Sequence, residues 1–382
     1  MWQARFVPLP ALDLNLPHLA DVVPSVLTAM GVAGFEARIP IRGDVAGACV
    51  LLVDGLGADL LDRHAADAPT LAALRGPTLQ VGYPATTAAG LAAVGTGLRS
   101  GEHGLVGYSF RVPAAGMLNA LRWREHPWGS DLRERAVPEQ VQPQPTTFER
   151  AAAAGMAVSV CSPAEFAGSG LTRAVLRGAD YRGVFALGDL AATVRNAVSA
   201  GEFCYAYHSE LDALGHLYGP GSLPWRMQLR QVDRLVESVM EALPPGGLLA
   251  VVADHGMVSA EETVDLDADP ALFDGVEAVA GEARARHVYT REGAVDDVLQ
   301  AWRARIGSRA WVVARDEAID AGWFGARVLD EVRDRIGDVV AAARDGAVLV
   351  RRTAEPMESA FVGHHGSLTA AEQTVPLLLA GL

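Results

Sequence analysis

Acidic, histidine and threonine side chains stand at points in this sequence where folding could bring them together. Asp54 closes the apolar run AGACVLLVD, and Asp254 with His255 follows the run GLLAVVA. Such runs are typical of buried strands in a parallel sheet, whose carboxyl ends meet at one edge where ligands collect. Carboxylate oxygens and neutral imidazoles are ligands for divalent metals such as Zn²⁺. Taken singly, an Asp-Gly after a strand is more often a plain turn than a metal ligand.

Two further segments carry the same side-chain types. In HSELDALGHLYGPG, Asp212 and His216 are four residues apart, which places them on one face of a helix. That spacing suits two ligands of one zinc-like ion, and a surface Asp–His pair is the alternative. Late in the chain, GHHGS places His364 and His365 in a glycine-flanked loop, where glycine permits close backbone approach.

A pair of threonines precedes a run of small residues in GYPATTAAGLAAVGTGL. This pattern predicts a helix that begins near Thr86 or Thr87, and an ordinary N-cap is the simplest role for either residue. A helix N-terminus also favours an anion, and a hydroxyl bound to a metal there could ionise and attack phosphorus.

Alternation of buried strands with helices predicts an α/β fold, with a central, mostly parallel sheet covered by helices on both faces. We expect strands at 46–54, 156–161, 203–208 and 247–254, and helices at 146–154, 189–200 and 224–243. Residues 257–360 have a looser pattern and are expected to form a smaller appended subdomain over the site. The apolar stripe of the helix at 224–243 is expected to face the core, through Met227, Val232, Leu235, Val236, Val239 and Leu243.

Composition narrows the possible functions. The 382 residues contain 32 Lys+Arg, all of them arginine, against 46 Asp+Glu, which gives a formal net charge of −14. Absence of lysine excludes Schiff-base enzymes, pyridoxal enzymes and Walker-type phosphate loops. The acidic balance argues against binding a nucleic-acid polymer or an anionic membrane, so an anionic substrate would require a local source of positive charge. Bound divalent metals would supply it.

Cysteine usage and hydropathy suggest a cytoplasmic protein. Cys49, Cys161 and Cys204 are far apart in the sequence and lie in apolar runs, which favours buried reduced thiols over disulfides. No basic segment followed by an apolar stretch opens the chain, and no run reaches the ~18 apolar residues of a membrane span. The sequence indicates no oligomeric state.

Five ordered segments together resemble the type I phosphodiesterase/nucleotide pyrophosphatase branch of the alkaline phosphatase superfamily. They are Asp54-Gly55, the Pro-x-Thr-Thr segment running to Thr96-Gly97 and His103-Gly104, Asp212-x-x-x-His216, Asp254-His255-Gly256, and His365-Gly366. The resemblance extends from about residue 46 to the C-terminus. It implies one alkaline phosphatase-like catalytic domain over residues 1–382, with 257–360 as a subdomain within it.

The resemblance also implies a centre with two divalent ions, Zn²⁺ in the first place and Mn²⁺ as the alternative. One ion would be held by Asp54, Asp254 and His255, together with the nucleophile, and the other by Asp212, His216 and His365. The nucleophile position falls on Thr87, with Thr86 as the fallback. His365 is preferred to His364 because the family's ligand directly precedes a glycine.

The activity implied is hydrolysis of a small phosphate ester, namely a phosphodiester or nucleotide pyrophosphate, through a phosphothreonine intermediate on Thr87. The alternatives are a phosphomonoesterase or phosphonate hydrolase of the same superfamily, or a non-catalytic relative that binds metal or ligand.

Two departures from the family pattern concern substrate contacts. Ala88-Ala89-Gly90 replaces the usual Pro-Asn after the nucleophile. Tyr108 stands where an asparagine commonly contacts a phosphate oxygen, and its hydroxyl could donate the same hydrogen bond. His103 is expected to be structural or to support the ligands. A phosphate contact and a solvated surface position are both open for the nearby arginines, Arg99, Arg122 and Arg124.

Overall fold

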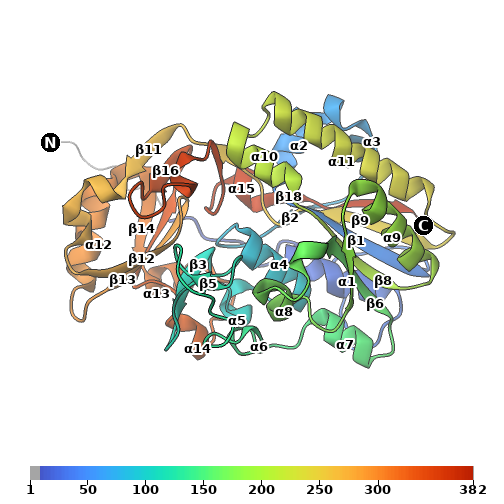
Figure 1. The fold of residues 1–382 in the computed structure, drawn as a ribbon, viewed down its shortest axis with the longest axis horizontal. Helices are drawn as coiled ribbons and strands as arrows, with labels where there is room; N and C mark the ends of the chain where they lie inside the picture. Colours follow the sequence, from blue (N-terminus) through green and yellow to red (C-terminus); the bar gives the residue numbers. More distant parts are fainter. Residues whose placement is uncertain (1–8, 382) are drawn as a thin grey trace.

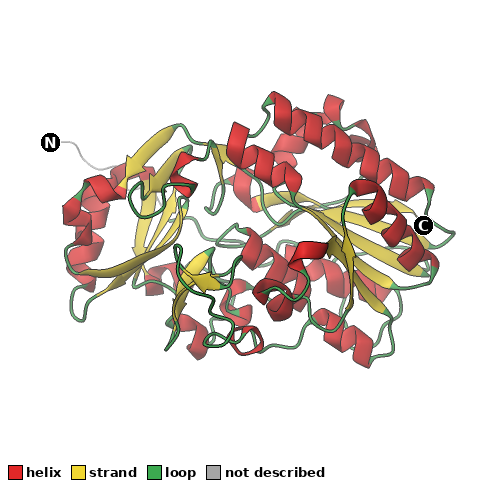
Figure 2. Cartoon of the chain, viewed as in Figure 1, coloured by secondary structure: helices red, strands yellow, loops and turns green. Residues whose placement is uncertain are grey.

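The computed structural model describes residues 9–381, and a six-stranded sheet forms its centre (Figures 1 and 2). The strand order is β19-β9-β1-β8-β6-β7, and all neighbouring pairs are parallel except β19 with β9. Helices cover both faces of the central strands, which explains why their sequences are continuously apolar rather than alternating. The predicted sheet is therefore confirmed, with these bounds: β1 (Gly47–Val53), β6 (Val158–Pro163), β7 (Asp180–Val184), β8 (Phe203–His208), β9 (Gly247–Val252) and β19 (Leu378–Gly381).

Two layers of helices enclose this sheet (Figure 1). One layer contains α2 (Ala58–Arg63), α3 (Pro69–Ala73), α9 (Leu187–Ser199), α10 (Glu210–Tyr218) and α11 (Leu223–Glu241). The opposite layer contains α1 (Val22–Ala29), α4 (Thr87–Thr96), α7 (Thr147–Ala153) and α8 (Gly170–Val175). The helices predicted at 146–154, 189–200 and 224–243 are α7, α9 and α11.

One residue of the predicted apolar stripe on α11 was assigned wrongly. Val232, Leu235, Val236 and Val239 are buried, but Met227 is 44% exposed. Met227 lies two residues after the fully buried Trp225. At ~100° per residue, that separation turns it to the side of the helix away from the core.

A second sheet lies beside the central one (Figure 2). It is antiparallel, with the order β12-β13-β15-β14, and it packs with α12 (Val295–Ile306) around Trp302 in a hydrophobic cluster of its own. The bounds 257–360 of a subdomain stay a prediction. The second sheet and its neighbours comprise β11 (Glu262–Asp265), β12 (Val276–Glu282), β13 (Ala285–Thr290), β14 (Ala310–Ala314), α13 (Arg315–Asp320), α14 (Asp330–Arg333), β15 (Val339–Ala343) and β16 (Ala347–Val350).

A buried ion pair joins the second sheet to the segment that returns to the central sheet. Arg284, just before β13, contacts Glu372 at 2.6 Å, and both side chains are fully buried. Glu372 lies on α15 (Ala370–Gln373) and also accepts hydrogen bonds from the Ser367 backbone and the Thr369 hydroxyl. Removing one partner of such a pair leaves an uncompensated charge and costs ~3–5 kcal/mol. The pair therefore fixes the loop that carries His365.

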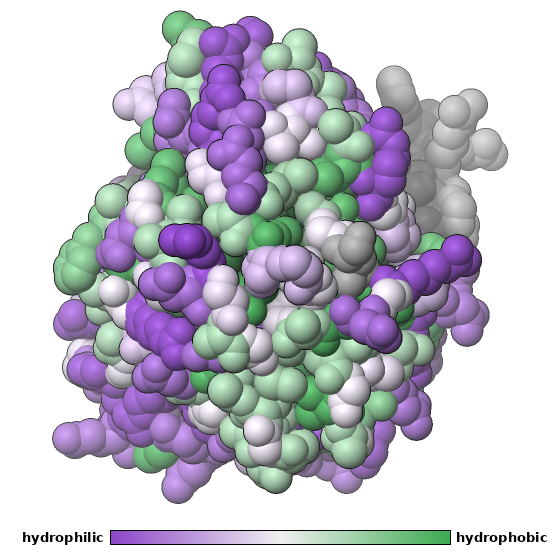
Figure 3. All heavy atoms as spheres, turned by 90° about the vertical axis from the view of Figure 1, so that its right-hand side faces the viewer, coloured by the Kyte–Doolittle hydropathy of each residue, from purple (hydrophilic) through white to green (hydrophobic). Residues whose placement is uncertain are grey.

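Smaller elements complete the described chain. In a three-stranded sheet, β3-β4-β5, Arg122 lies in the turn between β4 and β5, and Trp128 follows β5. Hydrophilic and apolar side chains are interleaved over the face shown in Figure 3. The remaining bounds are β2 (Thr78–Gln80), α5 (Ser100–His103), β3 (Ser109–Val112), β4 (Gly116–Asn119), β5 (Arg124–Glu125), α6 (Pro138–Val141), β10 (Val258–Ser259), β17 (Gly363–His364) and β18 (Thr374–Pro376).

The three cysteines are buried with free thiols, as predicted. Although they are distant in sequence, adjacent strands bring them together: Cys49 on β1 is opposite Cys204 on β8, and the sulfurs of Cys161 and Cys204 are 3.4 Å apart. Within residues 9–381, no helix combines the length and the apolar character that a membrane crossing would require.

Candidate metal centre and flanking cavities

The carboxyl ends of the central strands place the first candidate ligands. Asp54 directly follows β1, and Asp254 follows the neighbouring β9 after one residue. The Asp54 amide donates to the carbonyl of His208, the last residue of β8, at 2.9 Å. Asp54 and Asp254 are 2% and 0% exposed. The parallel register of three strands thus brings together residues that are some 200 positions apart in the chain, as the strand-end argument predicted.

Glycine at position 55 permits this arrangement. Its φ of +74° is in the left-handed region, which L side chains rarely adopt, and a Cβ here would be 3.0 Å from Asp212 Oδ1. The Gly55 amide donates to Asp254 Oδ1 at 3.2 Å. The turn after β1 therefore positions Asp254 and leaves room for Asp212.

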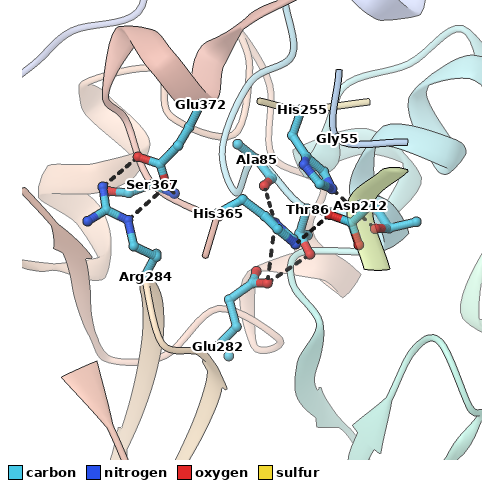
Figure 4. Close-up of polar contacts among 12 residues, drawn as sticks. Gly55, Ala85, Thr86, Asp212, His255, Glu282, Arg284, His365, Ser367 and Glu372 are labelled. Carbon is cyan, nitrogen blue, oxygen red and sulfur yellow. Dashed lines mark hydrogen bonds and ion pairs between the residues drawn. The ribbon is translucent and has the colours of Figure 1, made fainter. Parts of the chain in front are cut away.

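Asp212, His216 and His365 converge from two segments. Asp212 and His216 lie one turn apart on α10, with 3.3 Å between Asp212 Oδ2 and His216 Nε2. His216 Nδ1 donates to the Gly363 carbonyl at 2.8 Å, and His365 Nδ1 donates to the Ala85 carbonyl at 2.9 Å. In the neutral tautomers that these bonds define, the Nε2 lone pairs are free, and the two Nε2 atoms are 3.2 Å apart. Figure 4 shows His365 and Asp212 from this group.

His255 connects this group with the strand-end carboxylates. Its Nδ1 donates to the Gly256 carbonyl at 3.1 Å, and its Nε2 is 3.4 Å from Asp54 Oδ1 and 3.7 Å from Asp254 Oδ2. The His255 ring also stacks on the His365 ring at a centroid distance of 3.6 Å. All six predicted ligand residues are consequently in one cluster.

The atoms of this cluster fit divalent metal ions. Asp54 Oδ1, Asp212 Oδ1 and Asp254 Oδ2 are buried and have no hydrogen-bond partner among the described residues. Ligand atoms ~2.0–2.1 Å from a tetrahedral Zn²⁺ are ~3.3 Å apart, close to the 3.2 and 3.3 Å separations around His216. Two sets have ligand atoms within 4.8 Å of one another: Asp212, His216 and His365, and Asp54, Asp212 and His255. The first matches the predicted set, whereas in the second Asp212 takes the place predicted for Asp254.

The pKa shifts of the three aspartates also indicate that this cluster suits divalent metal ions. Burial raises the pKa values of Asp54 and Asp254, and the other nearby carboxylates add to both shifts. Burial also opposes ionisation of Asp212, but His216 and His365 outweigh it and hold its pKa well below the usual range. Buried carboxylates that raise one another's pKa are stabilised when a cation is placed between them.

The two threonines have different neighbours at the start of α4. Thr86 is the N-cap residue but makes no capping bond with its side chain, and its hydroxyl instead donates to Glu282 Oε2 at 3.0 Å. Thr87 Oγ1 lies 3.2 Å from His255 Nε2, beside the candidate ligands. A Cβ at Gly90, one turn later, would be 2.5 Å from the Cβ of Asp254. Glycine at this position lets α4 approach the ligands closely.

Two side chains near the cluster were missed by the sequence analysis. Tyr207, one residue before the end of β8, donates a hydrogen bond to Asp54 Oδ2, and the strand-end rule could have found it. Glu282 reaches the site from β12 of the second sheet, where no motif marks it. Burial raises the pKa of Glu282 to about 8, against the hydrogen bond from Thr86. Figure 4 shows the contacts of Glu282 with Thr86 and His365.

Two cavities meet at Thr87. Cavity A has a volume of about 230 Å³ and is lined by Glu282, Glu358, Phe361 and His365, among others. Cavity B has a volume of about 300 Å³ and is lined mainly by apolar and hydroxyl side chains, including Leu91, Phe166, Leu171, Tyr205 and Ser209. Both are bordered by Thr87, Leu121, Arg122 and Asp212.

The other predicted residues differ in whether they line these two cavities. Tyr108 lines cavity A, but its hydroxyl donates to Glu358 Oε1 at 3.1 Å. His364 also borders cavity A, with its Nε2 on the Phe361 carbonyl. Of the three predicted arginines, only Arg122 lines cavities A and B. Arg99 instead lies 3.9 Å from Asp21, and the Arg124 side chain donates to the Gly129 carbonyl. His103 is buried outside the cluster, where its Nδ1 accepts from the Leu105 amide.

The fold and the ligand cluster define a metal-dependent hydrolase of the alkaline phosphatase superfamily. A family model described as "Type I phosphodiesterase / nucleotide pyrophosphatase" matches residues 48–368, so the chain belongs to this family. The resemblance seen in the sequence is thereby confirmed. A comparison with curated protein sequences gives no match.

Solved structures have the same fold at low sequence identity. Murine ectonucleotide pyrophosphatase/phosphodiesterase 5 is 18% identical, with a TM-score of 0.66 over 88% of each chain. Phosphonoacetate hydrolase from Sinorhizobium meliloti, in complex with phosphonoformate, is also 18% identical, with a TM-score of 0.64 over 90% of this chain and 93% of that one. The human form of the first protein is 16% identical, with a TM-score of 0.60 over 88% of each chain.

Proposed function

We propose that this protein hydrolyses phosphodiesters, with Thr87 as the nucleophile and two divalent ions, Zn²⁺ in the first place, as cofactors. The observation that carries the proposal is the meeting of two cavities at Thr87, because a diester has two substituents to place. A phosphomonoester has one substituent and would leave one cavity without a role. Nucleotide pyrophosphates and phosphonates, the substrates named for proteins of similar fold, are the competing classes.

The ligand residues divide as follows in this proposal. Asp54, Asp254 and His255 hold the ion beside Thr87, and Asp212, His216 and His365 hold the other. Bound metal ions would lower the pKa of the Thr87 hydroxyl and neutralise charge on the leaving oxygen. Tyr207 fixes Asp54 through its hydroxyl, and the Gly363 and Ala85 carbonyls fix the tautomers of His216 and His365.

Thr87 then acts as a covalent nucleophile. Its Oγ forms a bond to phosphorus while the bond from phosphorus to the leaving alcohol breaks, and the alcohol departs with a proton. Water forms the new P–O bond in the second step, the bond to Thr87 breaks, and the threonine recovers its proton. The backbone N–H groups at the N-terminus of α4 would be available as donors to the phosphoryl oxygens. A murine relative of similar fold, inactive with a threonine changed to alanine, has been determined with AMP.

The decisive experiment compares Thr87→Ala with Thr86→Ala. On zinc-loaded protein, we expect Thr87→Ala to lower the rate on bis-(p-nitrophenyl) phosphate at least ~1,000-fold while both metal equivalents stay bound. Thr86→Ala removes a hydroxyl that Glu282 already engages and should retain most activity. The reverse pattern would assign the nucleophile to Thr86. Faster hydrolysis of p-nitrophenyl phosphate than of the diester by the wild type would refute diester preference.

A further inference from the structure

A third cavity lies at the carboxyl ends of β6, β7 and β8 and has no role in the proposed mechanism. Cavity C has a volume of about 330 Å³. Strand-end residues and the residues that follow them form much of its wall, including Pro163 at the end of β6, Val184 at the end of β7 and His208 at the end of β8. Cavity C therefore opens on the same edge of the central sheet as the metal cluster, whose Asp54 and Asp254 follow β1 and β9.

The connections that follow β6 and β7 explain why a cavity forms there. The chain leaves β6 toward α8, which packs against α4, and leaves β7 toward α9, which packs against α11 on the opposite face of the sheet (Figure 1). Adjacent parallel strands whose connections diverge to opposite faces leave a crevice outside their carboxyl ends, and ligands of open α/β sheets collect in such crevices. Cavity C therefore lies where this class of fold places its ligands.

The wall of cavity C combines an exposed aromatic ring with carboxylates. Phe185, the residue after β7, is 88% exposed, the highest value among the large apolar side chains of residues 9–381. Its amide donates to Asp189 Oδ2 at 3.1 Å, which fixes the backbone that carries the ring. Glu165 and Glu210 are exposed in the same wall, and the one basic group among the lining residues is the His208 imidazole, 2.8 Å from Glu210. An anion is therefore disfavoured in cavity C, whereas a ring without negative charge can stack on Phe185.

Cavity C is adjacent to cavity B, because Tyr207 and Ser209 line both. In an in-line displacement the leaving group departs opposite the nucleophile, here Thr87. His216 and His365, ligands of the second ion in the proposed centre, line cavity A, so the leaving substituent enters cavity A and the substituent that stays on phosphorus enters cavity B. A retained substituent that is longer than cavity B would pass Tyr207 and Ser209 and reach cavity C.

We propose that cavity C is a second subsite for the substituent that stays on phosphorus, and that it binds a ring at the far end of this substituent by stacking on Phe185. The substrate class is a phosphodiester of a long-chain alcohol that ends in an aromatic ring without negative charge. The inference rests on the proposed diesterase function. Stacking removes apolar surface of both rings from water, and this burial provides the driving force.

Matched p-nitrophenyl diesters test this inference with zinc-loaded, full-length protein. All have p-nitrophenol as the leaving group, so release of p-nitrophenolate gives kcat/KM while only the retained substituent differs. Chains of four, six and eight carbons that end in phenyl are compared with n-alkyl chains of the same lengths and with chains that end in 4-carboxyphenyl. At the length that reaches Phe185, the phenyl-ended ester should exceed the n-alkyl ester about tenfold, which is the order expected for burial and stacking of one ring. The carboxylate should cancel this gain, because Glu165 and Glu210 repel it.

Variants assign the preference to Phe185. Phe185→Ala removes the ring and should lower the phenyl-to-alkyl ratio of kcat/KM about tenfold, to near one, whereas Phe185→Tyr keeps a ring and should keep the ratio. Leu223→Ala is the matched control, because Leu223 on α11 is 64% exposed and lines none of cavities A, B and C. The control should keep the wild-type ratio. A purely structural role of Phe185 would change the rates on all esters alike and leave the ratio as it is.

The outcomes separate this inference from the proposed function. Equal kcat/KM for phenyl-ended and n-alkyl esters at every length, a carboxyphenyl ester as fast as the phenyl ester, or an unchanged ratio in Phe185→Ala would overturn the subsite in cavity C and leave the diesterase standing. If no ester of the series releases p-nitrophenolate with both metal equivalents bound, the diesterase proposal fails and the subsite fails with it.

Discussion

Gly90→Ala tests whether the close approach of α4 to the metal ligands is needed for catalysis. The new Cβ would be 2.5 Å from the Cβ of Asp254, whereas ordinary contacts begin at 3.4 Å, so the two groups must separate by about 3.4 − 2.5 = 0.9 Å. Thr87 lies one turn before Gly90 and moves with α4. Misplacement of a reacting group by ~1 Å can cost ~100-fold in rate, and overpacking costs ~1–3 kcal/mol of stability. We therefore expect kcat/KM on a diester to fall about 100-fold.

A glycine elsewhere in the fold provides the control. Gly188 lies on α9, where a Cβ would meet no atom within 4 Å. Gly188→Ala should keep full activity and gain a few tenths of a kcal/mol in stability, because alanine is the better helix residue. Both variants are compared by diester kinetics, zinc content and thermal unfolding. Wild-type kcat/KM in folded Gly90→Ala would refute the argument that α4 must hold Thr87 against these ligands.

Further predictions concern the metal, the substrate and stability in acid. Chelation should abolish hydrolysis and Zn²⁺ restore it, and His365→Ala should lower the zinc content by about one equivalent per chain in elemental analysis. Arg122→Gln should lower kcat/KM on diesters about tenfold with zinc content unchanged, if the arginine between the cavities contacts the phosphate. Arg226 and Arg230 lower the pKa of Asp67 from 3.8 to about 2, so its contribution to stability is present above pH ~4 and is lost as the pH falls through 2. The arginines are 41% and 49% exposed, so Asp67→Asn should cost only about 1 kcal/mol at pH 7 and flatten the acid limb of the unfolding free energy.

The residues that were predictable from the sequence are those set by strand ends and helix spacing. Asp54, Asp254 and His255 follow apolar runs, and a parallel sheet leaves little choice about where such residues lie. The proximity of Asp212 and His216 could be predicted from the helical repeat alone, because residues four apart lie on one face of a helix. His365 could be placed only through the family resemblance, because no local rule brings a loop near the C-terminus to Ala85 and His216.

The features that the sequence did not predict depend on contacts between elements that are distant in the chain. Glu282 reaches Thr86 because β12 of the second sheet packs against the site, and its sequence neighbourhood is ordinary for a strand. Arg99, Arg122 and Arg124 have the same charge, yet only Arg122 borders cavities A and B. The prediction that Met227 faces the core was wrong for a related reason. An apolar residue on an amphipathic helix is buried only where another element packs against it. Charge and periodicity are local properties, whereas these outcomes depend on tertiary packing.

The absence of lysine bears on the choice of substrate. Asp54, Asp212 and Asp254 contribute −3, so two divalent ions would leave the proposed centre at +4 − 3 = +1. A phosphodiester carries one negative charge and matches that value, whereas an ionised monoester carries about two. Among the residues that line cavity B, only Arg122 adds positive charge to the wall. The proposed site is therefore matched to a monoanionic phosphate.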